Sequence, residues 1–129
     1  MASELRVNTL KDASGNNSVG MSYVANGSAK AWLNYIMDSP SVVGSFNIAS
    51  VTDEGTGHFT QNFTNNMSAV DFLGCSSNNY TDSGSAINYS SGMRDSTTST
   101  IGYKRENSGG TAHDLTVQGN GLAVHGDLA

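Results

Sequence analysis

The chain lacks the residues that several common protein classes require. Its 129 residues include a single cysteine, Cys75, so neither an intrachain disulfide nor a cysteine-based zinc site can form. Six Lys and Arg face eleven Asp and Glu, a net charge of −5 that argues against a nucleic-acid partner, because phosphate contacts need clustered cations. No run of about eighteen apolar residues occurs, so we expect no membrane span. The first residues lack a basic stretch followed by an apolar one, so we expect no secretion signal.

The patterns that identify an active site or a metal centre are also missing. The three histidines show no metal-binding spacing, and a solvated or hydrogen-bonded role is the simpler interpretation. Nothing near Cys75 indicates an activated nucleophile, so we interpret it as a buried structural thiol. No nucleophile-elbow or phosphate-loop motif occurs, and Asp53 and Glu54 are adjacent in a predicted turn, where their carboxylates would diverge. We therefore expect no enzymatic activity, no metal and no cofactor.

Turn-forming residues are abundant instead. Ser, Thr, Asn and Gly make up nearly half of the chain and occur in short clusters between alternating runs of apolar and polar residues. Alternation is the period of a β-strand, and turns at intervals of about ten residues are typical of an all-β sandwich or barrel. Five short runs in the second half are predicted strands: residues 69–74, 85–90, 100–104, 115–118 and 122–125.

The clearest local prediction is a β-hairpin in the middle of the chain. Residues 45–51 and 58–63 both alternate, and residues 52–57 between them form a turn with two glycines. Residues 29–36 alternate as well. A helix is the alternative there, because the run has two alanines and a leucine, but its Trp, Tyr and Ile favour a strand. From alternation we expect the following core residues: Trp32, Phe46, Ile48, Phe59 and Phe63.

The predicted organisation is a short N-terminal piece followed by one domain. Residues 1–12 are predicted to form an N-terminal arm or an edge strand, and residues 13–129 a β-sandwich domain. The core is thin, since Phe, Trp and Tyr total only 8% of the chain, while a polar, glycine-rich chain loses much conformational entropy on folding. We therefore expect contacts between copies to supply part of the missing burial.

Three segments of the first half share a pattern with a known group of proteins. They are the opening MASELRVNTL with DASG at 12–15, the strand NGSAKAWLNY at 26–35, and the hairpin SFNIASVTDEGTGHFTQNF at 45–63. Together they resemble small virion structural proteins of marine tailed phages, a group of capsid-decoration and tail-fibre-like β-sandwich proteins. The resemblance implies a compact β-sandwich displayed on the particle, often as a trimer, and no enzyme. Beyond Phe63 no motif adds to it.

The leading interpretation is a trimeric capsid decoration (cement) protein with an antiparallel, jelly-roll-like β-sandwich and an extended N-terminal arm. It would bind the major capsid protein and stabilise the shell at the virion surface, after assembly in the bacterial host cytoplasm. The arm would lie across a neighbouring subunit or add a strand to the shell. We predict Leu5, Val7 and Leu10 as its apolar anchors and Arg6 as its charged contact; an ordinary edge strand of the chain's own domain is the alternative.

Two other functions stay open. A tail fibre or adhesin subunit would bind a host surface glycan or receptor, and Tyr80, Tyr89 and Tyr103 are then the predicted sugar-stacking residues, since they lie among Asn and Ser that could bond hydroxyl groups. Packing in the core or in an interface is the simpler role for each tyrosine. The second alternative is a secreted carbohydrate-binding β-sandwich, which the missing secretion pattern disfavours.

Overall fold

The computed structural model describes residues 3–78, 90–107, 109–114 and 120–129, and among these residues β-strands predominate, with one short helix. All strand pairings are antiparallel, which confirms the all-β antiparallel prediction. In chain order the elements are β1 Thr9–Lys11, β2 Ser18–Gly20, α1 Met21–Gly27, β3 Ala31–Ile36, β4 Ser41–Phe46, β5 Ile48–Gly55, β6 His58–Phe63, β7 Leu73–Asn78, β8 Ser90–Arg94, β9 Thr100–Glu106 and β10 Asn120–His125.

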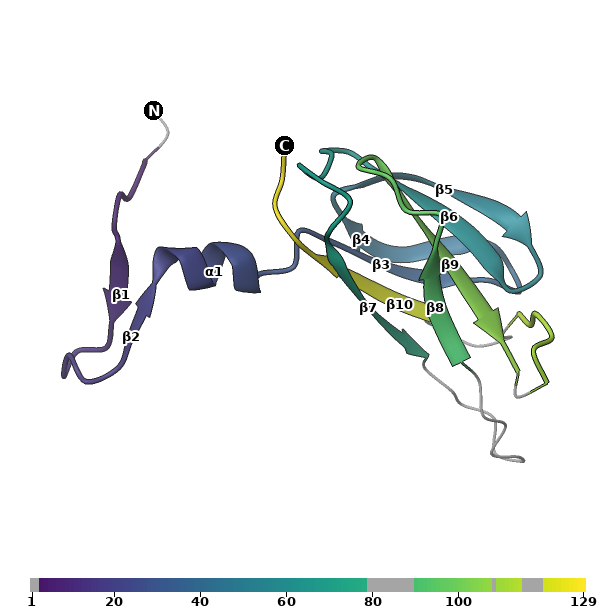
Figure 1. Cartoon of the computed structure of the whole chain (residues 1–129), viewed down its shortest axis with the longest axis horizontal. Helices are drawn as coiled ribbons and strands as arrows, with labels where there is room; N and C mark the ends of the chain where they lie inside the picture. Colours follow the sequence, from purple (N-terminus) through teal and green to yellow (C-terminus); the bar gives the residue numbers. More distant parts are fainter. Residues whose placement is uncertain (1–2, 79–89, 108, 115–119) are drawn as a thin grey trace.

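Eight of these strands form two four-stranded sheets that face each other (Figure 1). Sheet I has the strand order β4-β3-β10-β7, and sheet II has the order β5-β6-β9-β8. Three pairings join strands that follow one another in the chain, namely β3–β4, β5–β6 and β8–β9. This order does not establish jelly-roll connectivity, which stays a prediction.

The core lies between the two sheets and is crossed by a stack of aromatic rings. Tyr35 of sheet I packs on Phe59 of sheet II with ring centroids 4.9 Å apart, and Phe59 stacks on Tyr103 at 4.8 Å. Phe63 lies in a second buried cluster, and Ile48 is half-buried against both clusters. Phe59 and Phe63 are therefore confirmed as core residues.

The strand predicted over residues 29–36 is confirmed as β3, but Trp32 is not in the core. Ala31, Leu33 and Tyr35 are the buried residues of this strand. Successive side chains of a strand point to opposite faces, so Trp32 lies on the outer face of sheet I, where it is 42% exposed. The core prediction for Trp32 is therefore wrong, although the alternation that placed it opposite Leu33 is right.

Phe46 is also outside the core, because the chain changes sheets at Asn47. Residues 45–51 are not one strand: β4 ends at Phe46 in sheet I, and β5 begins at Ile48 in sheet II. Asn47 has a φ of 56°, in the left-handed region, and its side chain is bonded to the backbone of Asn65 at both ends. Phe46 is 54% exposed as a result, which corrects the second core prediction.

The predicted hairpin is present as β5–β6, although β5 continues to Gly55 through most of the turn predicted at residues 52–57. The shorter turn depends on two glycines. Gly55 and Gly57 have φ values of 100° and 72°, which L side chains rarely adopt. A Cβ atom on Gly57 would lie only 2.6 Å from the carbonyl oxygen of Arg105 and 2.7 Å from the backbone nitrogen of His113. Glycine is therefore required at position 57 by both backbone conformation and space.

The second half of the chain bears out part of the strand prediction. β9 and β10 cover the strands predicted at residues 100–104 and 122–125. The strand predicted at 115–118 lies outside the described residues, and so does the one predicted at 85–90 apart from the first residue of β8.

The strand predicted at residues 69–74 is displaced toward the C-terminus. β7 begins only at Leu73. Phe72 just before it is buried and meets Phe63 edge-on, with ring centroids 6.0 Å apart. Phe72, which lies within the predicted strand, is thus a core residue of the loop before β7.

Residues 3–28, the N-terminal segment, lie to one side of the two sheets (Figure 1). Its strands β1 and β2 pair only with each other within the described structure, with Leu10 opposite Val19, and α1 follows directly. The strands of the two large sheets begin at Ala31, whereas the sequence analysis placed the boundary after residue 12. The sequence analysis also gave no indication of α1.

Candidate functional site

The four predicted arm residues lie in the N-terminal segment. Leu5 is 80% exposed, Leu10 is 43% exposed and Val7 is half-buried. The Arg6 guanidinium donates to the Glu4 carboxylate through Nε at 2.8 Å and through Nη2 at 3.2 Å. This ion pair is exposed, so it adds little stability and could exchange for a partner's carboxylate. Only Leu10 belongs to a strand, since the three others precede β1.

The β1–β2 turn is organised by the carboxylate of Asp12. Its Oδ1 accepts bonds from the backbone N–H of Asn16 at 3.0 Å and the hydroxyl of Ser14 at 2.9 Å, and its Oδ2 accepts one from the Asn17 side chain at 2.7 Å. The Ser14 bond contributes most to lowering the pKa of Asp12 below its usual 3.8. Because the folded pKa is lowered, this stabilisation is present at higher pH and is lost as pH falls through the lowered pKa.

The N-terminal segment has no core of its own. No described side chain of β1, β2 or α1 is buried, and α1 has seven residues without a side-chain bond at its N-cap. The cross-strand pair Leu10 and Val19 is 43% and 38% exposed, and Tyr23 is 75% exposed. An isolated two-stranded hairpin is marginal in water, and so is a helix of this length. The segment therefore presents apolar side chains that an external surface would stabilise.

One of the three predicted sugar-contact tyrosines can be placed, and it is not available to a sugar. Tyr103 is fully buried in β9 and stacked on Phe59. Burial raises its pKa above the usual 10, an effect that a hydrogen bond with Ser91 partly offsets. The sugar-contact prediction for Tyr103 is therefore wrong. Tyr80 and Tyr89 lie outside the described residues.

The outer face of sheet I carries exposed aromatic rings that the sequence analysis had assigned to the core. Trp32 and Phe46 are cross-strand partners, and the register continues from Trp32 to Ala123 of β10 and Cys75 of β7. We call these four residues, one from each strand, the aromatic row. Cys75 is exposed there, so the expectation of a buried thiol is wrong. The Trp32 ring lies close against Gly44, where an added Cβ would be 3.3 Å from the ring.

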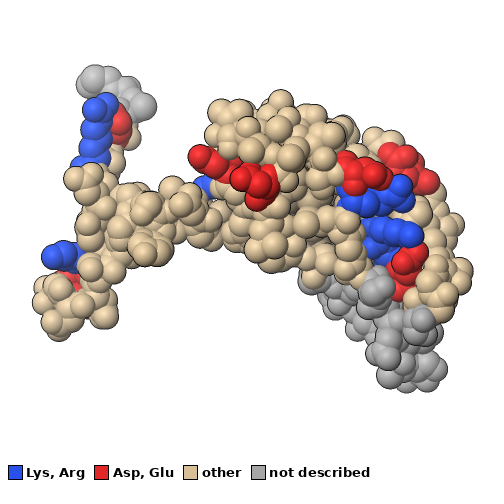
Figure 2. Space-filling model, in the orientation of Figure 1, with Lys and Arg blue, Asp and Glu red and all other residues tan. Residues whose placement is uncertain are grey.

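Sheet I is also free of charge along its strands. None of its four strands contains Asp, Glu, Lys or Arg, whereas those of sheet II contain six such residues. In Figure 2, side chains of both signs gather at the end of the molecule opposite the N-terminal segment. Charge depletion with exposed aromatics is typical of the centre of a protein interface. This missing charge was the sequence signal that could have identified the face.

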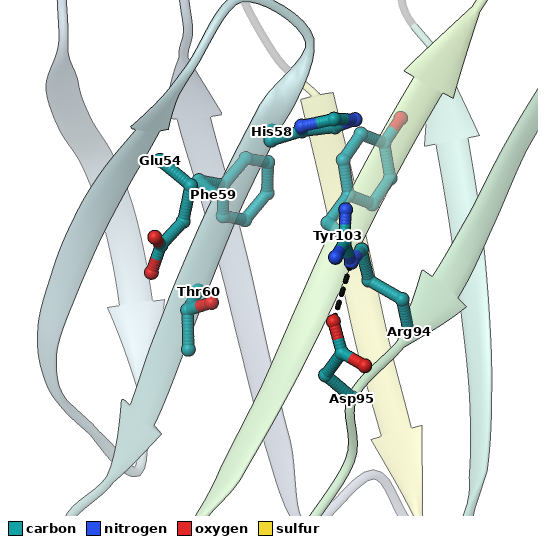
Figure 3. Close-up of a pocket in the computed structure, with 7 residues that line it drawn as sticks. All are labelled: Glu54, His58, Phe59, Thr60, Arg94, Asp95 and Tyr103. Atoms are coloured by element: carbon teal, nitrogen blue, oxygen red, sulfur yellow. Dashed lines mark hydrogen bonds and ion pairs between the residues drawn. The ribbon is translucent and has the colours of Figure 1, made fainter.

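A polar pocket of about 330 Å³ opens on sheet II (Figure 3). The residues that line it are Glu54, His58, Phe59, Thr60, Arg94, Asp95 and Tyr103. Phe59 and Tyr103 have almost no exposed surface. A molecule bound in the pocket would therefore contact mainly the polar side chains that line it. Arg94 Nε is paired with Asp95 Oδ2 at 2.6 Å. The pocket suits a small polar molecule, and it includes no residue of the arm prediction or of the aromatic row.

Among the described residues, no group of three or more His, Cys, Asp or Glu side chains is placed to hold a metal ion. The described part of the chain also contains no helix with the length and apolar character needed to cross a membrane. Comparisons of the chain with protein-family models, curated proteins and solved structures found no match.

Proposed function

We propose that this chain is a non-enzymatic structural protein of a phage particle, a β-sandwich that assembles as a homotrimer and decorates the capsid at the virion surface. The observation that carries the proposal is the N-terminal segment, whose apolar side chains lie exposed without a core of their own. A segment of this kind is stabilised by a partner surface. The resemblance of the first half to phage virion proteins supplies the setting, with assembly in the bacterial host cytoplasm.

The proposed partner is the major capsid protein, with no role for nucleic acid, a membrane or a cofactor. Residues 3–8 lie across a capsid subunit or add a strand to it, with Leu5 and Val7 buried and Arg6 paired to an acidic group. Burying a leucine contributes about 1.5–3 kcal/mol, so one arm binds weakly. A trimer presents three arms at once, and such linkage raises affinity steeply.

The first test is the copy number of this chain in purified particles, measured by quantitative mass spectrometry against the major capsid protein. We expect a number comparable with that of the capsid protein. A small fraction of it would assign the chain to the tail and contradict decoration. Absence from the particles would contradict both virion functions.

The second test concerns the arm contact itself. We expect Leu5→Asp to weaken binding to undecorated shells at least about tenfold, since it removes roughly the burial of one leucine side chain. Ser22→Asp is the matched control, because it adds the same charge at an exposed position of the N-terminal segment outside residues 3–8. Sedimentation of shells with bound protein measures both variants. Full occupancy with Leu5→Asp would refute the arm contact.

The adhesin alternative has one structural observation in its favour, and it comes from an unexpected residue. Trp32 presents a partly exposed ring on an uncharged sheet, a surface on which a sugar ring could stack. A glycan screen with folded protein tests this alternative and the secreted carbohydrate-binding one together. Binding that Trp32→Ala abolishes would support a glycan function, and no binding would leave it without support.

A further inference from the structure

The polar pocket lies on the outer face of sheet II, where one row of the strand register crosses three strands. Thr60 of β6 pairs with Gly102 of β9, and Gly102 pairs with Arg94 of β8. Their chain neighbours Phe59 and Tyr103 face the core, so this row faces outward. A Cβ atom on Gly102 would lie 2.7 Å from the Arg94 carbonyl oxygen and 3.0 Å from Arg94 Cγ. The glycine therefore lets the Arg94 side chain lie close over β9 at the pocket (Figure 3).

Arg94 is held by a residue with an unusual backbone conformation. Asp95 follows β8 with a φ of 46°, in the left-handed region that side chains other than glycine rarely adopt. In this conformation its Oδ2 accepts a bond from Arg94 Nε at 2.6 Å. The two terminal nitrogens of Arg94 make no hydrogen bond within the described residues. Residues in sparsely populated backbone regions gather at binding sites, and here the ion pair leaves two positioned donor groups at the pocket.

The opposite wall of the pocket carries polar groups that also lack partners. Figure 3 shows Glu54 of β5 and Thr60 of β6 across the pocket from the Arg94–Asp95 pair. Neither the Glu54 carboxylate nor the Thr60 hydroxyl makes a hydrogen bond to a described residue. His58 lines the pocket as well, and its Nε2 is buried without a hydrogen-bond partner in the described part of the chain. Polar groups that converge on a cavity in this way are typical of a ligand site.

The lining indicates a neutral ligand that is rich in hydroxyl groups. Two carboxylates and one guanidinium line the pocket, a net charge of −1 that disfavours an anion, while Arg94 disfavours a cation. Phe59 and Tyr103 are 1% and 0% exposed, so an apolar ligand finds almost no surface there. A hydroxyl both donates and accepts, so adjacent hydroxyls can bond Glu54 and Arg94 together. The volume of about 330 Å³ is at the lower end for ligand pockets and suits a single sugar ring.

We propose that this pocket binds one ring of a neutral saccharide. The Glu54 carboxylate accepts from one hydroxyl, the Arg94 guanidinium donates to a neighbouring one, and the Thr60 hydroxyl bonds between them. This inference goes beyond the proposed function, because it gives a decorating subunit a second contact, to a glycan. The contact lies on sheet II, whereas Trp32 lies on sheet I, and it does not involve the N-terminal segment.

NMR titration of the full chain tests the pocket, with glucose, galactose, mannose and rhamnose as separate probes. We expect at least one of them to bind with a Kd of about 1 mM, since one ring makes few contacts. Glu54→Gln and Arg94→Gln should each weaken this binding about tenfold, the loss expected when a hydrogen bond to a charged group is removed. Asp38→Asn is the matched control for Glu54→Gln, because it removes an exposed carboxylate outside the pocket. It should bind as the native chain does, and circular dichroism verifies that all variants fold.

The charge of the ligand supplies the second measurement. Raising the salt concentration should change the Kd of the neutral probe by less than about twofold, since salt screens only charges. Glucuronate and glucosamine, the charged counterparts, should bind more weakly than the neutral probe. No binding of the four neutral probes, tighter binding of a charged one, or equal losses in Glu54→Gln and Asp38→Asn would overturn the inference. Binding that Trp32→Ala abolishes and Glu54→Gln leaves intact would place the sugar on sheet I and overturn it too. Because no capsid is present, failure here is separate from failure to decorate particles.

Discussion

At the scale of single residues, Gly57 combines a left-handed backbone with too little space for a side chain. Its φ is 72°, and an added Cβ would meet the Arg105 carbonyl oxygen at 2.6 Å. We expect Gly57→Ala to lower the free energy of unfolding by about 1–3 kcal/mol from the left-handed backbone alone, with the clash adding to this. Gly92→Ala is the control, since nothing lies within 4 Å of its Cβ position. Equal urea midpoints for the two variants would disprove the steric explanation.

Tyr103 makes a prediction about alkaline pH. Burial raises its pKa in the folded protein, so just above pH 10 the unfolded chain loses a proton that the folded chain keeps. The unfolded state then binds fewer protons, and the free energy of unfolding falls as the pH rises. We expect Tyr103→Phe to make this fall shallower in denaturant titrations between pH 9 and about 11. A Tyr103→Phe slope equal to the native one would contradict the account.

The same residues show what alternation can and cannot predict. In β3 the pattern correctly separates Trp32 from Leu33 and Tyr35, but it does not say which set faces inward. Alternation alone therefore gave the wrong face for Trp32. Tyr103 was predicted as a sugar contact only under the adhesin alternative, with packing as the simpler role, and its position in β9 places it against Phe59. The inward face depends on the opposite sheet, which short-range patterns do not contain.

At the scale of elements, the Asn47 corner transfers the chain from one sheet to the other. Its Oδ1 accepts the Asn65 backbone N–H at 2.7 Å, and its Nδ2 donates to Asn65 O at 3.0 Å. We expect Asn47→Ala to destabilise the protein by about 1–3 kcal/mol, because it loses these bonds and strains the left-handed backbone.

Two comparisons separate these causes. Asn47→Gly keeps the conformation without the bonds, so we expect an intermediate loss of unfolding free energy. Asn62→Ala removes only a surface bond to the Ser50 hydroxyl, so its effect should be small. Thermal and urea unfolding measure all three variants. An Asn47→Ala stability equal to that of Asn62→Ala would show that the corner does not depend on this side chain.

Elements with local signals were predictable, and elements set by distant contacts were not. The β5–β6 hairpin is confirmed because two alternating runs flank glycines that its turn requires. The break between β4 and β5 at Asn47 was not predicted, because the Asn65 backbone that binds the Asn47 side chain lies far along the chain. α1 was missed because it buries no side chain of its own, so its sequence shows no apolar stripe facing a core.

At the scale of the whole molecule, the two sheets have different surfaces. The strands of sheet II carry charges of both signs and border a polar pocket, whereas those of sheet I carry none. Leu5 and Leu10 of the N-terminal segment were predicted as contact residues from the sequence; both are exposed, and their contact role stays a prediction. The aromatic row draws one residue from each of four strands, so only the strand register could reveal it.

Because the N-terminal segment has no core of its own, the chain should be cleaved by proteases faster as a free subunit than after assembly. As a free subunit it offers proteases a segment that is held by few contacts, and cleavage depends on how often such a segment opens. Once the segment is covered by another subunit, the same peptide bonds become inaccessible. Under the proposed function, surplus copies would be degraded from the N-terminus while incorporated copies persist, so the host's proteases would adjust the supply of this protein to the number of particles being built.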